Sequence, residues 1–225
     1  MFDKRDHSAL RRVMLRGFAL AGVAGGGVLG WLREAAAANP DSGMRSIKGD
    51  VRIDGAPAAS GQPVRPGQTV TTGPGGEAVF VIGRDAFLQR GNSSFAIERS
   101  GAGVLVLRYL SGKVLSVFGK GRKTLMTPTA TIGIRGTACY IEAEEERTYF
   151  CLCYGRAMLT PLGEGAQAMT LHTSHHERPL YVGIGKGSIE PAHVVNHTDA
   201  ELTMLEALVG RKPPFLGKLK DGGAY

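Results

Sequence analysis

The sequence has few of the residues that build cross-linked or membrane-spanning folds. Among 225 residues there are three cysteines, and all of them lie between residues 139 and 153, which excludes a disulfide framework spread along the chain. Aromatic residues make up 7% of the chain. The uncharged run at residues 17–32 is shorter than the roughly 20 apolar residues of a stable transmembrane helix.

Positive charge exceeds negative charge only modestly. The formal net charge is +7, and the first 34 residues carry six basic and three acidic groups, or +3 of that total. The remaining excess is scattered along the sequence, with small basic clusters at 119–123 and at the C-terminus. This distribution argues against nucleic acid as a partner.

Patterns that carry catalysis or nucleotide binding are also missing. Serine, histidine and aspartate occur, but no nucleophile elbow or fixed spacing connects them. The glycines of residues 183–187 do not open a helix, as a phosphate-binding loop would require. The acidic run Glu144–Glu146 is typical of a solvated turn. The sequence therefore predicts no catalytic residues and a protein that is not an enzyme.

The N-terminus has the layout of an export signal. A basic stretch ending in Arg11-Arg12 precedes the uncharged run, and small residues follow at Ala35–Ala38. The twin arginine and the weakly apolar run resemble a twin-arginine (Tat) signal. We predict that residues 1–38 are this signal, cleaved near Ala38 and otherwise retained as an anchor. Either outcome places the body of the protein in the periplasm, free or anchored to the inner membrane, with membrane contact only through an uncleaved N-terminus.

The body reads as short alternating strands separated by glycine, of which the chain holds 33. A hairpin is expected to turn at residues 144–147. One helix is expected at 198–209, where Thr198 and Glu201 form a capping box and Gly210 ends the helix. The predicted class is all-β, with short antiparallel or solenoid-like strands and one C-terminal helix. The predicted strands are 49–53, 68–72, 77–82, 86–89, 94–98, 104–109 and 113–118.

The motifs of this body resemble the FecR domain family. "PGQTVTTGPGGEAVFVIG" and "LSGKVLSVFGK" lead to "TPTATIGIRGTACYIE", and Gly155 follows on the returning strand. The residues that carry the match are Thr127, Pro128, Arg135, Gly136 and Thr137. The resemblance implies an extracytoplasmic β-domain that binds or relays signals, which we place at residues 45–165. Residues 166–225 are then an extension with the helix.

The chain departs from the family in one respect that bears on function. FecR regulators carry a cytoplasmic anti-sigma segment before their membrane span, whereas about 16 residues precede the apolar run here. The first expectation is therefore an exported, non-catalytic binding or sensing domain with a protein partner in the periplasm or envelope. The alternatives are a cofactor-free structural module of the cell envelope and a periplasmic signalling regulator akin to FecR.

The three cysteines pose a question of register. If the sequence numbers of paired residues in the hairpin sum to 290, Cys139 lies opposite Cys151, and Cys153 shares their face. A slip of one residue would send Cys139 to the other face. Three interpretations stay open: a Cys139–Cys151 disulfide, a metal or iron–sulfur site, and buried apolar thiols.

The histidines favour the metal interpretation. Five follow the cysteines, and "LHTSHHERP" begins about 20 residues after Cys153. Thiolate and imidazole together suit zinc, copper or iron. The spacing matches no zinc-ribbon, ferredoxin or haem motif. We predict a site of Cys139, Cys151, Cys153, His175 and His176, holding zinc, iron or an iron–sulfur cluster.

Overall fold

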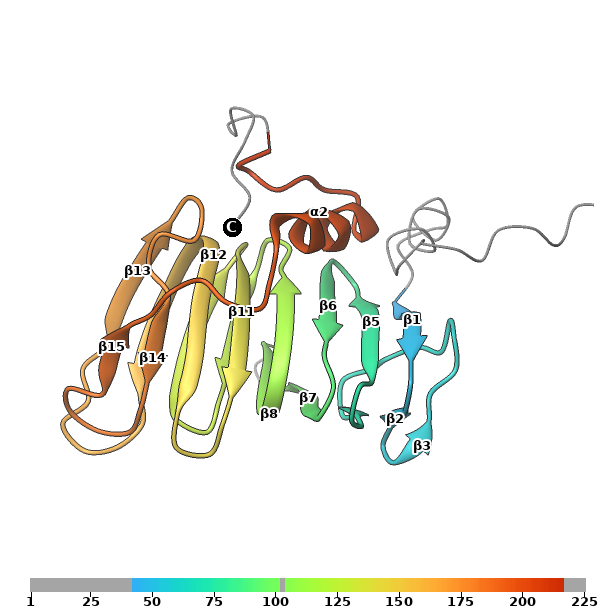
Figure 1. The fold of residues 1–225 in the computed structure, drawn as a ribbon, viewed down its shortest axis with the longest axis horizontal. Helices are drawn as coiled ribbons and strands as arrows, with labels where there is room; N and C mark the ends of the chain where they lie inside the picture. Colours follow the sequence, from blue (N-terminus) through green and yellow to red (C-terminus); the bar gives the residue numbers. More distant parts are fainter. Residues whose placement is uncertain (1–41, 102–103, 217–225) are drawn as a thin grey trace, which may run out of the picture.

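The structure is a computed structural model that describes residues 42–101 and 104–216. It is all-β with one C-terminal helix, as predicted (Figure 1). The strands are β1 (Gly43–Lys48), β2 (Val51–Ile53), β3 (Ala56–Pro57), β4 (Thr69–Thr72), β5 (Glu77–Ile82), β6 (Asp85–Gln89), β7 (Ser93–Arg99), β8 (Leu105–Val117), β9 (Arg122–Met126), β10 (Ala130–Arg135), β11 (Ala138–Ala143), β12 (Thr148–Pro161), β13 (Met169–Thr173), β14 (Leu180–Val182) and β15 (Ile189–Pro191); the helix is α2 (Asp199–Leu208).

These strands form two layers that share two long strands. One layer, which we call the helix-side sheet, has the order β1-β5-β6-β8-β11-β12-β14-β15 and runs across Figure 1 from β1 on the right to β14 and β15 on the left. The other, the distal sheet, has the order β3-β2-β4-β7-β8-β9-β10-β12-β13. Strands β8 and β12 pass from one sheet into the other.

Each shared strand bends at a glycine. Gly112 in β8 has a φ of 80° and Gly155 in β12 has a φ of 102°, which is a conformation that side chains with a Cβ rarely adopt. A Cβ at Gly112 would also lie 2.2 Å from the hydroxyl oxygen of Ser93. The two strands predicted at 104–109 and 113–118 are therefore one bent strand. Gly155, expected at the end of its strand, lies within β12.

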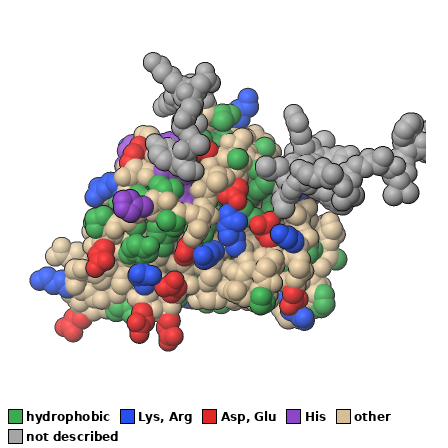
Figure 2. Space-filling model, in the orientation of Figure 1, with side chains coloured by type: hydrophobic (Ala, Val, Ile, Leu, Met, Phe, Trp, Pro, Cys, Tyr) green, Lys and Arg blue, Asp and Glu red, His purple; other side chains and the backbone are tan. Residues whose placement is uncertain are grey.

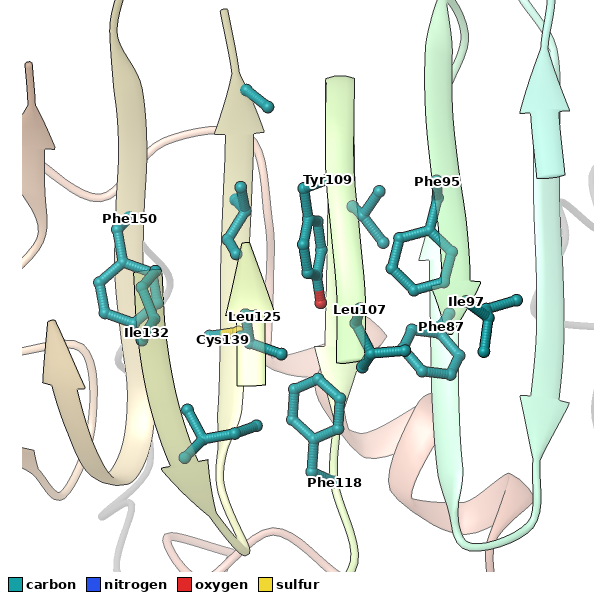
Figure 3. Packing of buried hydrophobic residues seen from close by; sticks show 14 of the residues in the cluster. Phe87, Phe95, Ile97, Leu107, Tyr109, Phe118, Leu125, Ile132, Cys139 and Phe150 are labelled. Atoms are coloured by element: carbon teal, nitrogen blue, oxygen red, sulfur yellow. The ribbon is translucent and has the colours of Figure 1, made fainter. Parts of the chain in front are cut away.

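Alternation along the strands creates two cores. The inner core lies between the sheets and contains a group of aromatic rings: Phe87 lies 5.0 Å from Phe80 and 5.1 Å from Phe95, between ring centroids (Figure 3). The outer core lies between the helix-side sheet and α2, which contributes Leu202, Leu205 and Leu208. Phe215 follows the helix, and most other residues of this outer core come from alternate positions of β5, β6, β8, β11 and β12.

The segment expected as an extension is built into both sheets. Strand β13 pairs with β12 in the distal sheet, while β14 pairs with β12 in the helix-side sheet. The glycine-rich stretch at 183–187 connects β14 to β15 in an edge hairpin. Within the described residues, no helix is long and apolar enough to cross a bilayer. The predicted signal at residues 1–38 lies outside the described residues.

The predicted helix start is confirmed in detail. Thr198 is the N-cap, its hydroxyl accepts a hydrogen bond from the backbone N–H of Glu201, and the Glu201 carboxylate accepts one from the backbone N–H of Thr198 at 2.9 Å. Glu201 also pairs with Arg90, with 2.7 Å between Nη2 and Oε1. This links the first turn of α2 to the end of β6.

Replacing the N-cap is expected to weaken the docking of this helix. We predict that Thr198→Ala lowers the free energy of unfolding by about 1 kcal/mol, because a backbone donor loses its partner. The melting temperature should then fall by about 2–4 °C in calorimetry. Thr203→Ala is the matched control within α2, since its hydroxyl only donates back to the carbonyl of Asp199. An equal loss in both variants would contradict a specific role for the cap.

Candidate metal centre

The hairpin register places only two of the three thiols together. Cys139 pairs with Leu152 and Tyr140 pairs with Cys151, so paired residue numbers sum to 291 rather than the assumed 290. The reason is the loop: Ala143 pairs with Thr148, which leaves the four residues 144–147 in the turn. The turn residues were predicted correctly, but the pairing across the turn was shifted by one.

The predicted Cys139–Cys151 disulfide is therefore wrong for this fold, and Cys139 is wrong as a metal ligand. Cys139 lies in the inner core (Figure 3), whereas Cys151 and Cys153 face the outer core. All three thiols are free. Burial raises the pKa of the Cys139 thiol, so it behaves as a neutral apolar group.

Four side chains converge on the outer side of β12. Cys151, Cys153, His176 and His197 each direct one ligand atom so that all these atoms lie within 4.8 Å of one another. Cys151 Sγ lies 3.4 Å from His176 Nδ1, which lies 3.1 Å from His197 Nε2. With zinc–sulfur bonds of about 2.3 Å and zinc–nitrogen bonds of about 2.0–2.1 Å, tetrahedral geometry requires ligand separations of about 3.3–3.8 Å. The cluster is close to this size.

Three separate segments supply these ligands. Strand β12 places Cys151 and Cys153 on one face because they are two residues apart. His176 lies in the connection from β13 to β14, with a φ of 56°, and its backbone N–H donates to the Cys153 carbonyl at 3.0 Å. His197 directly precedes the N-cap of α2 and stacks on Tyr140, with 4.6 Å between ring centroids.

The second nitrogen of each histidine has an acceptor of its own. His197 Nδ1 lies 2.6 Å from the Val195 carbonyl oxygen, and His176 Nε2 lies 3.2 Å from Asp199 Oδ1. A nitrogen that faces an oxygen acceptor at these distances carries the proton, which leaves a lone pair on the other ring nitrogen. His176 Nδ1 and His197 Nε2 thus face each other at 3.1 Å beside the Cys151 sulfur. This arrangement requires either an additional proton or a cation between these atoms.

The electrostatics of the cluster favour a thiolate. Hydrogen bonding from Cys153, against the effect of burial and with help from His176 and His197, lowers the pKa of Cys151 to about 4. Burial raises the pKa of Cys153. Burial alone would lower the pKa of His176, but the Cys151 thiolate and the Asp199 carboxylate raise it. The anionic sulfur of Cys151 stabilises positive charge at this site, and the raised pKa of His176 is one result of it.

Asp199 joins the cluster to a second histidine. Its carboxylate lies 2.9 Å from His175 Nε2 and, as described, contacts His176. The sequence predicted both His175 and His176; His176 is in the four-residue cluster, and His175 is next to it through Asp199. His197 and Asp199 were not predicted as site residues. The sequence signal for His197 was its position directly before the N-cap. A helix that packs on the sheet places the residue before its N-cap close to the hairpin.

We expect the carboxylate of Asp199 to hold His176 in the orientation that metal binding needs. The variant Asp199→Asn should lower metal affinity about 10–100-fold, because such supporting contacts fix ring orientation and basicity. Competition titration with a chromophoric chelator measures this change. The matched variant is Glu177→Gln, since Glu177 only accepts backbone hydrogen bonds in the same loop. An unchanged affinity in Asp199→Asn would show that His176 is oriented by packing alone.

The chain is similar in fold to two solved structures. No protein-family model matches it, and no curated protein matches it. Two crystal structures described as a "putative anti-sigma factor" from Parabacteroides distasonis ATCC 8503 are similar, with TM-scores of 0.47 and 0.46 and 11% identity. In each case the match covers 56% of this chain and 59% of the other chain.

Proposed function

We propose that this protein is a non-catalytic FecR-like binding and sensing domain that holds one transition-metal ion at Cys151, Cys153, His176 and His197. The observation that carries the proposal is the convergence of these four buried side chains with their ligand atoms within 4.8 Å of one another. Two thiolates and two imidazoles are a common donor set for tetrahedral zinc, which we take as the metal that fits best.

The geometry supports a single ion over an iron–sulfur cluster. In a two-iron cluster with two cysteine and two histidine ligands, each pair binds a different iron, so bridging sulfides separate the thiol pair from the imidazole pair. Here a cysteine sulfur and a histidine nitrogen are 3.4 Å apart, which suits two ligands of the same ion. The zinc and iron alternatives remain part of the proposal; the two-iron cluster is disfavoured.

A thiol nucleophile is the competing interpretation, because Cys151, His176 and Asp199 are arranged as a nucleophile, a base and an orienting carboxylate. The burial of the two thiols disfavours this interpretation. Cys151 and Cys153 have no exposed surface, and both lie in the outer core beneath the segment that leads into α2. A substrate carbonyl could not reach the sulfur without displacing this segment, whereas a metal ion fits among the side chains.

Bound metal would act as a connection between distant segments. It would join β12, the β13–β14 connection and the residue before α2, so the position of α2 on the sheet would depend on metal occupancy. A cavity of about 620 Å³ lies next to this region, with His175 and Phe215 among its lining residues. Their rings are 4.5 Å apart between centroids. A metal-dependent position of α2 would therefore change the shape of this cavity and of the surface around it, which a protein partner could read.

The signalling role akin to FecR rests on the sequence motifs. Thr127, which opens the motif, accepts hydrogen bonds from Ala130 N–H and from the Thr148 hydroxyl, and Gly136 has a φ of 62°. These residues shape the turn before β10 and the bend before β11. An exported position facing the periplasm and a protein partner in the envelope are parts of this proposal.

Cobalt titration tests the metal proposal directly. We expect one equivalent of Co²⁺ to produce thiolate charge-transfer bands near 300–350 nm and tetrahedral d–d bands between about 600 and 700 nm, both displaced by zinc. Iodoacetamide labelling under native conditions provides the second arm. Because Cys151 is buried, it should label slowly and more slowly still with metal bound, whereas rapid labelling with no cobalt spectrum would support the nucleophile instead. Spectra of octahedral cobalt would also contradict the assigned ligands.

A further inference from the structure

Three arginines that lie far apart in the sequence form a row across the outer face of the distal sheet. Arg122 in β9 pairs directly with Arg135 in β10. Ile134 pairs with Ala157, so the next position along these antiparallel strands brings Arg135 beside Arg156 in β12. Arg156 pairs in turn with His172 in β13. All four side chains are exposed.

This row is unfavourable for folding. Neighbouring strands are about 4.8 Å apart, and like charges on directly opposed residues destabilise a sheet. None of the three arginines forms an ion pair with another residue in the described part of the chain. Strands β9, β10 and β12 are interior to the sheet, so charges that protect a sheet edge do not explain the row.

A hollow lies beside the arginines. Gly133 in β10 has no side chain, and a Cβ there would meet only the Met158 carbonyl oxygen, at 4.0 Å. The resulting depression measures about 570 Å³. Its lining includes no carboxylate and no aromatic ring; besides the three arginines it is formed mainly by Val104, Thr124, Gly133, Met158 and Thr170.

We propose that this arginine row and hollow bind a linear phosphate polymer other than nucleic acid. Arginine forks match phosphate oxygens in a bidentate manner, and a line of cations across three strands suits a line of anions. The lining offers no ring on which a base could stack, which is how single-stranded nucleic acids are usually held. The narrow row also differs from the broad basic surface that anionic membranes attract.

Binding of long-chain inorganic polyphosphate to the full-length protein tests this proposal. In the triple variant Arg122→Gln, Arg135→Gln, Arg156→Gln, affinity at about 50 mM salt should fall about 100-fold, and the salt dependence should become less steep by about two to three ions. The matched control is Arg65→Gln, Arg178→Gln, Lys186→Gln, which removes the same charge from other exposed positions and should change affinity less than about fivefold.

Further outcomes decide whether the proposal holds. The triple variant should melt at the same temperature as the parent or a few degrees higher, because repulsion within the row is relieved; a large fall would make the arginines structural and overturn the proposal. An equal loss of affinity in the arginine-row variant and in the control variant would show that binding depends only on net charge, which would overturn the proposal. Tighter binding to an oligodeoxynucleotide or to phosphatidylglycerol vesicles than to polyphosphate would also overturn it. Cys151→Ser should keep polyphosphate binding, because the metal cluster lies on the outer side of the helix-side sheet, away from the distal sheet that carries the arginines.

Discussion

Zinc affinity is expected to fall about 100- to 1,000-fold when Cys151 is replaced by serine. Structural zinc sites in small peptides contribute about 10–16 kcal/mol, so the loss of one ligand in four removes about 3–4 kcal/mol of binding free energy. Serine keeps the size of the side chain, so the outer core around β12 should remain packed. The measurement is competition against a chelator of known affinity, with bound zinc counted after gel filtration.

Cys139→Ser is the control that tests the register as well as the site. Cys139 lies next to Cys151 in the expected hairpin pairing, yet the structure directs it into the inner core. Its replacement should leave zinc stoichiometry at one per chain, although a buried hydroxyl will lower stability modestly. Zinc loss in Cys139→Ser as well as in Cys151→Ser would place both thiols on one face. It would then restore the register assumed from the sequence.

Removal of zinc should lower the melting temperature by about 8–16 °C. A ligand present at 1,000 times its dissociation constant stabilises the folded state by about 4 kcal/mol, and each kcal/mol shifts the melting temperature of a domain of this size by about 2–4 °C. The effect has a structural cause here. Without a metal ion, His176 Nδ1 and His197 Nε2, which lie 3.1 Å apart, are no longer joined through a shared ligand to β12.

Calorimetry with and without a strong chelator measures this shift. The Cys151→Ser variant is the matched control, since its melting temperature should respond little to the chelator. Hydrogen exchange adds local information: the amides of α2 should exchange faster in the chelated protein, because His197 connects the start of that helix to the cluster. An identical melting temperature with and without the chelator would mean that the four residues do not bind a metal ion that stabilises the fold.

Local patterns in the sequence were sufficient for the elements that depend on neighbouring residues. The alternation in residues 77–82 and 94–98 predicted strands that the structure contains as β5 and as part of β7, since the alternation of side chains between two faces is a property of the strand alone. The capping box at Thr198 and Glu201 predicted the start of the helix to the residue. Strands β9 and β13 were not predicted, because each has five residues and too few alternating positions to stand out from the turns on either side.

The candidate site was predictable only where it depends on the spacing of residues within one strand. Cys151 and Cys153 share a face by their spacing alone, so their grouping followed from the sequence. The connection of His176 to them depended on a loop that folds back to the Cys153 carbonyl. His197 and Asp199 arrive through the docking of α2, which residue spacing does not encode.

By itself, the sequence determined the all-β class, the turn at residues 144–147 and the pairing of two thiols with at least one histidine of the 175–176 pair. Only the tertiary structure decided that Cys139 faces the opposite core, that His197 completes the cluster, and that three scattered arginines form one row. The physical reason is common to all three. A strand's own period sets which of its residues share a face, but register and layer packing set which faces meet, and these depend on contacts between residues distant in sequence.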